Sequence, residues 1–486
     1  MKHITVNPTG TAPLSSAPES AQYPLVTFIA AIAACYGLTT LNPLETAWTC
    51  ALLLMLLRWF WWREQPGILL FCLLIPFLEI HTTLLEANQK NLTLNQLFFG
   101  TGQKTFWMSS LSLLAVAIGI KTTWSLTNRR SITFPIGRIK ESAAQLHQQK
   151  LVFAFIGASF IGQAIDILIP YRSSLRQLEV YALGVSEVLL FVIAVKFMLD
   201  RKHLWMVVCI FTYLIVISFY SFFSSWKDPL TVLLVASLIR VTVFDIRQLI
   251  RLFPILIPAI FLVFIWQNIK GDYRQFLNGG KFSQQVVVTQ DEALNKFQEL
   301  AINTVTSNNI LESESLDATY RRIGYLEYFA NAVAKVPSEI PHEQGVLLQS
   351  NLEFALIPRF LSPNKGLKDD KAKVEKYTDF YFGEYGGSSF SLGHYCEAYI
   401  DWGRNGMLLQ LFLFGIVGGG LFLIVLSRTM SLNPLLSLGL LWVCMKPWGT
   451  FQQDMVTMSG QVFWGAVCHL VIFFPFYRWV NGWIKR

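Results

Sequence analysis

The hydrophobic positions of this chain fall into long blocks separated by short polar segments. Several blocks reach the length of about 20 residues that a helix needs to cross a bilayer. Hydropathy therefore predicts about twelve membrane-spanning helices. The predicted spans are residues 25–43, 46–62, 67–85, 106–122, 151–170, 179–199, 204–223, 229–245, 251–268, 405–427, 432–449 and 460–478.

These blocks divide the chain into four parts and predict an all-α, polytopic integral membrane protein. Residues 1–24 form a polar, disordered cytoplasmic tail, and residues 25–268 hold the N-terminal spans. Residues 269–404 form one large external loop, and residues 405–486 hold the last spans and a short cytoplasmic tail. Because lipid tolerates no unpaired backbone, the loop must fold over the spans or line a cavity.

The large loop itself divides into two halves by composition. In its first half, apolar residues recur at helical spacing and predict helices in "DEALNKFQELAINTV" and in "YRRIGYLEYFANAVAKV". Its second half is rich in Gly, Pro, Lys and Tyr, which is typical of loops.

Charge sets the predicted orientation. Only 14% of the residues are charged, against roughly 25% in an ordinary soluble domain. With the N-terminus in the cytoplasm, the cytoplasmic segments hold about three times as many Lys and Arg as the short external loops, as the positive-inside rule requires. Both termini are then cytoplasmic. The net charge of +8 is read as an orientation signal and not as a nucleic-acid interface.

Cysteine and histidine spacing predicts neither disulfides nor a bound metal. Of the seven cysteines only Cys396 falls in the large external loop, so it has no partner there. The chain has no CxxC or HExxH spacing, which metal sites commonly use. We expect no metal and no other cofactor.

Basic residues gather on the external side, against the positive-inside rule. They occur in "SSWKDP", "NIKGDYR", "YRRIGY" and "IPRFLSPNK", and they are Lys227, Lys270, Arg274, Arg321, Arg322, Arg359 and Lys365. Arginine suits a phosphate or diphosphate because its planar fork donates two hydrogen bonds and stays charged. The alternative is that each residue is separately solvated or contacts lipid headgroups.

The stretch "YFGEYGGSSFSLGHYCEAYIDWGRNG" supplies further candidates. His394 is our first candidate for a general base, with Glu397 as the alternative or as its orienting partner. The alternative is that His394 caps a helix or hydrogen-bonds locally and that Glu397 pairs with a loop Arg. Tyr385, Tyr395 and Tyr399 are candidates to stack on sugar rings, or else to form an interfacial aromatic belt.

Taken in order, these motifs resemble the Wzy-type repeat-unit polymerases of O-antigen and exopolysaccharide, within the group that includes the O-antigen ligases. The resemblance covers roughly the C-terminal half of the chain. One position departs from the family pattern: Gly366 follows Lys365 where a proline is usual.

The resemblance implies a metal-independent glycosyltransferase at the periplasmic face of the bacterial inner membrane. Donor and acceptor would be glycans linked to undecaprenyl diphosphate, and a chain-length regulator would be a further partner. The basic residues would hold the diphosphate, and the large loop would cover the active site. A ligase that transfers the glycan to another acceptor, or a flippase of lipid-linked sugars, are the alternatives. Transporters are typically built from internal repeats, which this chain lacks.

Overall fold

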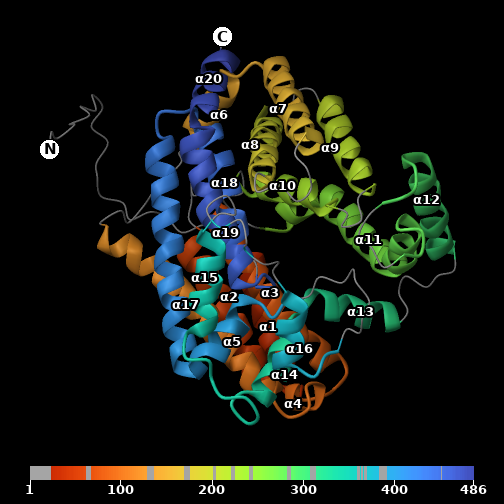
Figure 1. Cartoon of the computed structure of the whole chain (residues 1–486), viewed down its shortest axis with the longest axis vertical. Helices are drawn as coiled ribbons and strands as arrows, with labels where there is room; N and C mark the ends of the chain where they lie inside the picture. The colour runs from red at the N-terminus through yellow and green to blue at the C-terminus, as the bar shows by residue number, and fades with distance from the viewer. Residues whose placement is uncertain are drawn as a thin grey trace.

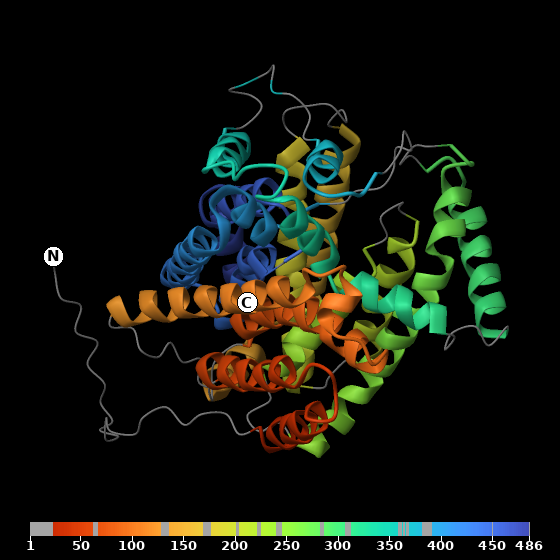
Figure 2. The ribbon, with the colours of Figure 1, turned by 90° about the horizontal axis from the view of Figure 1, so that it is seen from below.

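A computed structural model describes most of the chain. The described residues are 23–61, 67–127, 136–168, 176–200, 204–220, 225–239, 245–281, 286–306, 313–357, 362, 365, 369–381, 391–449 and 451–485. Within these ranges every regular element is a helix, which agrees with the predicted all-α class. Figure 1 shows the C-terminus at one end of the long axis of the molecule, and Figure 2 gives the view along this axis.

The helices before the large loop overlap the predicted spans, except for α4 and α6, which lie between spans. They are α1 (Pro24–Gly37), α2 (Pro43–Phe60), α3 (Ile68–Gln89), α4 (Leu94–Leu97), α5 (Gly102–Leu126), α6 (Ile136–Ala144), α7 (Gln148–Leu168), α8 (Arg176–Asp200), α9 (Leu204–Ser218), α10 (Lys227–Leu238) and α11 (Ile246–Leu277). Prolines at the first helical position, as in α1 and α2, start helices without losing a hydrogen bond.

The remaining helices belong to the large loop and to the C-terminal part. They are α12 (Gln290–Thr306), α13 (Ser313–Ile323), α14 (Leu326–Lys335), α15 (Val346–Leu356), α16 (Asp370–Tyr377), α17 (His394–Thr429), α18 (Pro434–Met445), the 3₁₀ helix η2 (Lys446–Gly449), α19 (Met455–Val467), the π-helix η3 (Cys468–Ile472) and α20 (Phe474–Ile484). The final predicted span, 460–478, is thus divided among α19, η3 and α20.

The prediction for the second half of the large loop was wrong in part. Both α15 and α16 lie there, and α17 begins at His394, inside the predicted loop. The side chain of Asp369 starts α16 by accepting a hydrogen bond from the backbone N–H of Ala372. Gly403, with φ of 65°, breaks the helical geometry inside α17, so the first turns of α17 form a separate segment.

Five helices in the described part of the chain are long and apolar enough to cross a membrane. They are Ile68–Gln89, Gly102–Leu126, Val180–Asp200, His394–Thr429 and Met455–Ile472. Two shorter apolar helices cover Pro24–Gly37 and Trp205–Ser218. These helices define a helical membrane protein, while the total of twelve crossings stays a prediction.

Helices α5 and α17 pack closely along their length, and glycine makes this possible. A Cβ atom on Gly415 would lie 2.2 Å from the carbonyl oxygen of Val116. A Cβ atom on Gly119 would lie 2.2 Å from the carbonyl oxygen of Phe412. Small residues let membrane helices approach this closely, so the two backbones pack in direct contact.

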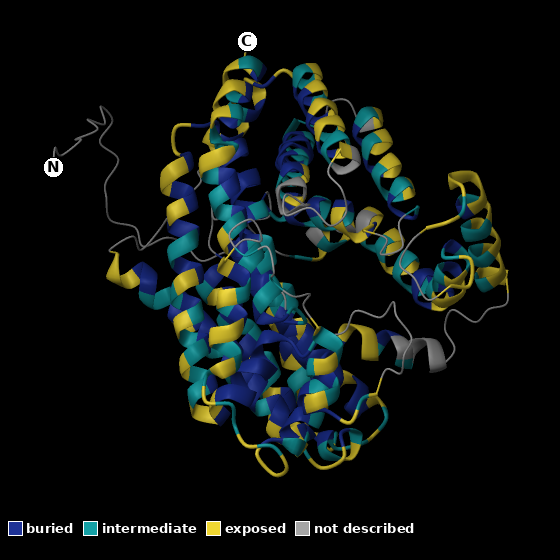
Figure 3. Cartoon of the chain, in the orientation of Figure 1, coloured by how far each residue is buried: buried dark blue, intermediate teal, exposed yellow. Residues whose placement is uncertain are grey.

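The buried apolar residues form two clusters. The main core joins α2, α3, α5, α8, α14, α17 and α18, and Figure 3 shows its buried residues concentrated around α3, α5 and α17. A smaller core joins α10, α11 and α12 around Trp226, Trp266 and Tyr273. Helix α13 contacts both α3 and α11, so it bridges the two cores (Figure 1).

Candidate functional site

Four basic side chains from three helices lie close together where α13 bridges the two cores. This cationic cluster consists of Lys227 of α10, Lys270 and Arg274 of α11, and Arg322 of α13. Arg322 lies near enough to act electrostatically on the other three members. Three motifs that are far apart in the sequence therefore meet at one place.

The smaller core fixes the α10 and α11 side of the cluster. Trp226 is 1% exposed and directly precedes Lys227. Tyr273 is fully buried, and its hydroxyl donates a hydrogen bond of 2.9 Å to the carbonyl oxygen of Phe219. Because Tyr273 lies next to Arg274, this anchor holds the end of α11 in place. Lys270 Nζ donates a hydrogen bond of 2.6 Å to Gln267 Oε1.

The positive charges in the cluster oppose one another. Burial and the charges of the other three members lower the pKa of Lys270 to about 8. Burial and Arg322 also lower the pKa of Lys227, although the nearby Asp228 raises it. The pKa of Arg274 is lowered by burial and again by Arg322. Within the described residues Lys227, Lys270 and Arg322 form no salt bridge, so an anion would be stabilised here.

Two carboxylates border the cationic cluster. Asp228, which acts on Lys227, is held by Lys446, with 3.2 Å between Oδ1 and Nζ. Lys446 also pairs with Glu187 at 3.0 Å, and Glu187 accepts a hydrogen bond from Trp442 Nε1. Lys446 therefore links helices through ion pairs, and its charge is already balanced by these two carboxylates.

Glu79 of α3 is the second carboxylate, and sequence reasoning missed it. The residue is only 7% exposed, and Arg322 acts on it electrostatically. The backbone N–H of Phe451 donates a hydrogen bond of 2.9 Å to Glu79 Oε2. A signal was present: Glu79 is an ionisable residue inside the apolar run "LLIPFLEIHTTLL", and such residues in spans are usually functional.

The other predicted cations lie elsewhere or outside the described residues. Arg321 acts on Glu327 and not on the cluster. Lys365 Nζ donates hydrogen bonds to the carbonyl oxygens of Ile357, at 2.7 Å, and of Phe354, which close the end of α15. Arg359 lies outside the described residues, so its role stays a prediction.

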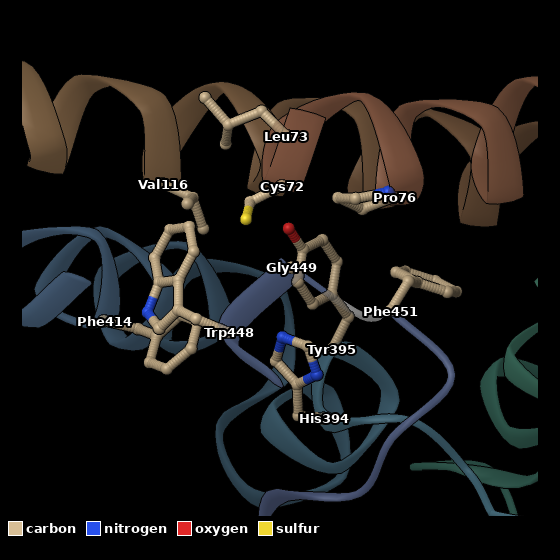
Figure 4. Close-up of a pocket in the computed structure, with 10 residues that line it drawn as sticks. All are labelled: Cys72, Leu73, Pro76, Val116, His394, Tyr395, Phe414, Trp448, Gly449 and Phe451. Atoms are coloured by element: carbon tan, nitrogen blue, oxygen red, sulfur yellow. The ribbon is translucent and has the colours of Figure 1, made fainter. Parts of the chain in front are cut away.

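His394 is buried in the interior and lines a very small cavity. The side chain is 2% exposed, and its Nδ1 lies 3.1 Å from the carbonyl oxygen of Gln453. Its ring packs against Tyr395 and Phe414, and Figure 4 shows both aromatic rings beside it. The cavity volume is about 10 Å³, which holds about one water molecule and no sugar. A base role for His394 stays a prediction.

Glu397 is committed to a buried ion pair. Lys373 Nζ lies 2.7 Å from Glu397 Oε1, and Glu397 Oε2 accepts hydrogen bonds from Asn351 Nδ2 and from the backbone N–H of Met455. These contacts join α15, α16, α17 and the start of α19. The pairing partner is a lysine of the large loop and not an arginine. No hydrogen bond between His394 and Glu397 occurs in the part of the chain that is described.

Two of the three tyrosines that were predicted to stack on sugar rings are buried in the interior. Tyr395 is 2% exposed and packs edge-on against Phe451, with ring centroids 4.8 Å apart. Tyr399 is equally buried, and its hydroxyl donates to the carbonyl oxygen of Val336. Both rings serve interior packing here, so sugar stacking stays a prediction. Tyr385 lies outside the described residues.

A long apolar groove runs between α15, α17 and α19. Its volume is about 990 Å³, and its walls include Leu352, Leu413 and Val462. Phe414 lines both this groove and the small cavity at His394. Mostly apolar surfaces of this kind accommodate hydrocarbon chains, although Gln410, Arg428 and Ser459 also line the groove. In the described ranges no three His, Cys, Asp or Glu side chains gather as metal ligands would.

The fold and its apolar helices define a helical membrane protein. Residues 130–423, more than half of the chain, match the family described as "Domain of unknown function (DUF8712)", and the chain belongs to this family. That match includes all four members of the cationic cluster and ends before α18. Searches of the curated proteins and of the solved structures gave no match.

Proposed function

We propose that this chain is a Wzy-type repeat-unit polymerase, a glycosyltransferase that joins lipid-linked oligosaccharide units at the periplasmic face of a bacterial inner membrane. The observation that carries the proposal is the approach of Arg322 to Lys227, Lys270 and Arg274. These residues come from "SSWKDP", "NIKGDYR" and "YRRIGY", three of the motifs on which the resemblance depends.

The chemistry of the cluster favours a diphosphate ligand. Four like charges that oppose one another raise the free energy of the empty site, and a ligand with several negative charges relieves this repulsion. The two arginines can bind phosphate oxygens through two parallel hydrogen bonds each, whereas the lysines act as point charges. A monoanionic ligand would leave most of the repulsion in place.

The same cluster would assist glycosyl transfer. When the anomeric carbon of the donor sugar leaves its lipid diphosphate, negative charge grows on the departing oxygen. Fixed cations that face this oxygen stabilise the transition state without reorganising, which is commonly the largest catalytic contribution. The apolar groove beside α17 supports a lipid substrate, because its mostly apolar walls suit a hydrocarbon chain.

The proposed topology puts the cluster at the periplasmic face, with both termini in the cytoplasm. A periplasm-specific reporter fused after Lys335, at the end of α14, tests this orientation. We expect activity in the periplasm and none in the cytoplasm. Cytoplasmic activity at this position would contradict the proposed reaction, because the lipid-linked donor is used on the periplasmic side.

A binding experiment tests the ligand. The purified protein in nanodiscs is titrated with undecaprenyl diphosphate, and undecaprenol serves as the probe without phosphate. We expect Arg322→Ala to weaken binding of the diphosphate at least tenfold and Arg322→Lys to weaken it less. Arg321→Ala is the matched control, since Arg321 is adjacent on α13 but faces Glu327. Equal affinity of the wild-type protein for both lipids would overturn the diphosphate site.

A deletion strain of the source organism separates the possible reactions. Loss of a polymerase leaves single repeat units attached at the cell surface. Loss of a ligase leaves long chains on the lipid carrier, and loss of a flippase leaves single units at the cytoplasmic face. The proposal expects the first result, and either of the other two would replace it.

A further inference from the structure

We propose that Glu79 accepts the proton of the attacking sugar hydroxyl during glycosyl transfer, an inference that depends on the proposed function. The observation behind it is the position of this buried carboxylate on α3, at the edge of the cationic cluster and within electrostatic reach of Arg322. A general base must reach the attacking hydroxyl, which lies within a few ångströms of the leaving group because bond formation and bond cleavage occur at the same carbon.

Glu79 is distinguished from the other acidic residue that borders the cluster by its partners. Asp228 is held by Lys446 in a salt bridge. Glu79 forms no salt bridge within the described residues, although Arg322 is near. A carboxylate that is locked to a lysine is a poor proton acceptor, so Glu79 is the better candidate of the two.

Hydrogen bonds fix the orientation of the Glu79 carboxylate. Its Oε2 accepts the N–H of Phe451, and its own backbone carbonyl accepts the N–H of Tyr325, which links α3 to the segment that follows α13. The ring of Phe451 packs edge-on against both Tyr325 and Tyr395. The Glu79 carboxylate also accepts hydrogen bonds from Gln452, so it is held at the segment that connects η2 to α19.

The two residues that the sequence suggested as bases are less well placed. His394 lies in a cavity for about one water, which leaves no room for a sugar hydroxyl group and its ring. Glu397 is paired with Lys373 and bonded to two further groups. Glu79, by contrast, lies within electrostatic reach of Arg322.

The step balances in atoms and charge. The acceptor hydroxyl oxygen forms a bond with the anomeric carbon of the donor, while the bond from this carbon to the lipid diphosphate breaks. The bonding electron pair leaves with the diphosphate, whose new negative charge faces the cationic cluster. The hydroxyl proton passes to the Glu79 carboxylate and then to solvent.

Single-turnover polymerisation in nanodiscs tests the inference, with lipid-linked repeat units taken from the deletion strain. We expect Glu79→Gln to lower the rate about 10²- to 10⁴-fold, the usual contribution of a general base, and to change the affinity for undecaprenyl diphosphate less than threefold. The ascending limb of the wild-type pH–rate profile should be absent in this variant. Glu45→Gln is the control, because Glu45 is also a buried carboxylate but binds Gln103 and Trp107.

Glu79→Asp keeps the carboxylate and covers the case in which Glu79→Gln does not fold. We expect this variant to retain the ascending limb at a reduced rate. A Glu79→Gln rate within threefold of wild type, or an equal loss of turnover and of diphosphate binding, would overturn the inference and leave the polymerase proposal standing. If the wild-type protein makes no polymer, the proposed function fails and the inference fails with it.

Discussion

Lys90 at the end of α3 forms a salt bridge with Asp317 of α13, with 2.9 Å between Nζ and Oδ2. Lys90 also contacts Glu86 of its own helix at 2.8 Å. Five residues after Asp317, the same helix α13 carries Arg322. The position of the arginine in the cationic cluster therefore depends in part on a tether between α3 and α13.

The first prediction concerns this tether. Asp317→Asn should weaken binding of undecaprenyl diphosphate by up to about fivefold, because a partly exposed ion pair contributes about 0.2–1 kcal/mol. Titration in nanodiscs at low salt measures the effect, and high salt should reduce it. Glu299→Gln is the control, since it removes the salt bridge to Lys296 on α12, far from α3 in the fold. Equal effects of the two substitutions would show that α13 is held by other contacts.

The second prediction concerns pH. The pKa of Lys270 is lowered to about 8, so Lys270 loses its charge as the pH rises from 7 to 9. Binding of undecaprenyl diphosphate should weaken over this range, because the ligand needs the charged form. Lys270→Arg should remove most of the pH dependence, since arginine stays protonated.

The stability of the ligand-free protein should change in the opposite direction. The pKa of Lys270 is lower in the folded state than in the unfolded state, so folding disfavours its protonated form. The free energy of unfolding should therefore rise as the pH increases from about 8 towards the ordinary lysine value of 10.5. Thermal unfolding in detergent with and without ligand measures both trends. A ligand affinity that is constant from pH 7 to 9 would exclude Lys270 from the site.

The third prediction concerns the buried pair of Glu397 and Lys373. Glu397→Ala should lower the free energy of unfolding by about 3–5 kcal/mol, because it takes the carboxylate partner from the mostly buried ammonium group of Lys373 and leaves it the hydrogen bond to Asn351 Oδ1. The comparison is Glu299→Ala, which removes the more exposed pair with Lys296 and should cost about 1 kcal/mol or less. Thermal or denaturant unfolding in detergent distinguishes the two. Similar small losses for both variants would mean that solvent reaches Lys373 freely.

The fourth prediction concerns the contact of α5 with α17. Gly415→Ala should destabilise the protein by about 1–3 kcal/mol, because its Cβ would overlap the carbonyl oxygen of Val116. Gly420→Ala on the same helix is the matched control: a Cβ there meets no atom within 4 Å, so it should be neutral or stabilising. If both variants unfold at the wild-type temperature, the two helices can separate at little cost.

The sequence alone determined the helical class and the location of the helices. Runs of apolar residues predict spans because lipid requires internally hydrogen-bonded backbone. Each predicted span accordingly overlaps a helix, and α12 matches "DEALNKFQELAINTV" closely. Helices α15 and α16 were missed, since they are short and held by tertiary contacts: the backbone N–H groups of Leu347 and Leu348, for example, bond to Asp401.

Only the tertiary structure decided which of the basic and acidic residues belong together. Arg321 and Arg322 are neighbours in one motif, yet the 100° rotation between successive helical residues directs them to different partners. His394 and Glu397, chosen for their polar neighbourhood, are buried in separate contacts. Glu79 meets Arg322 across more than 240 residues of sequence, because α13 packs between α3 and α11. The local pattern of apolar and polar residues predicts burial and helix formation. The proximity of side chains that are distant in the sequence arises only from the packing of helices in three dimensions.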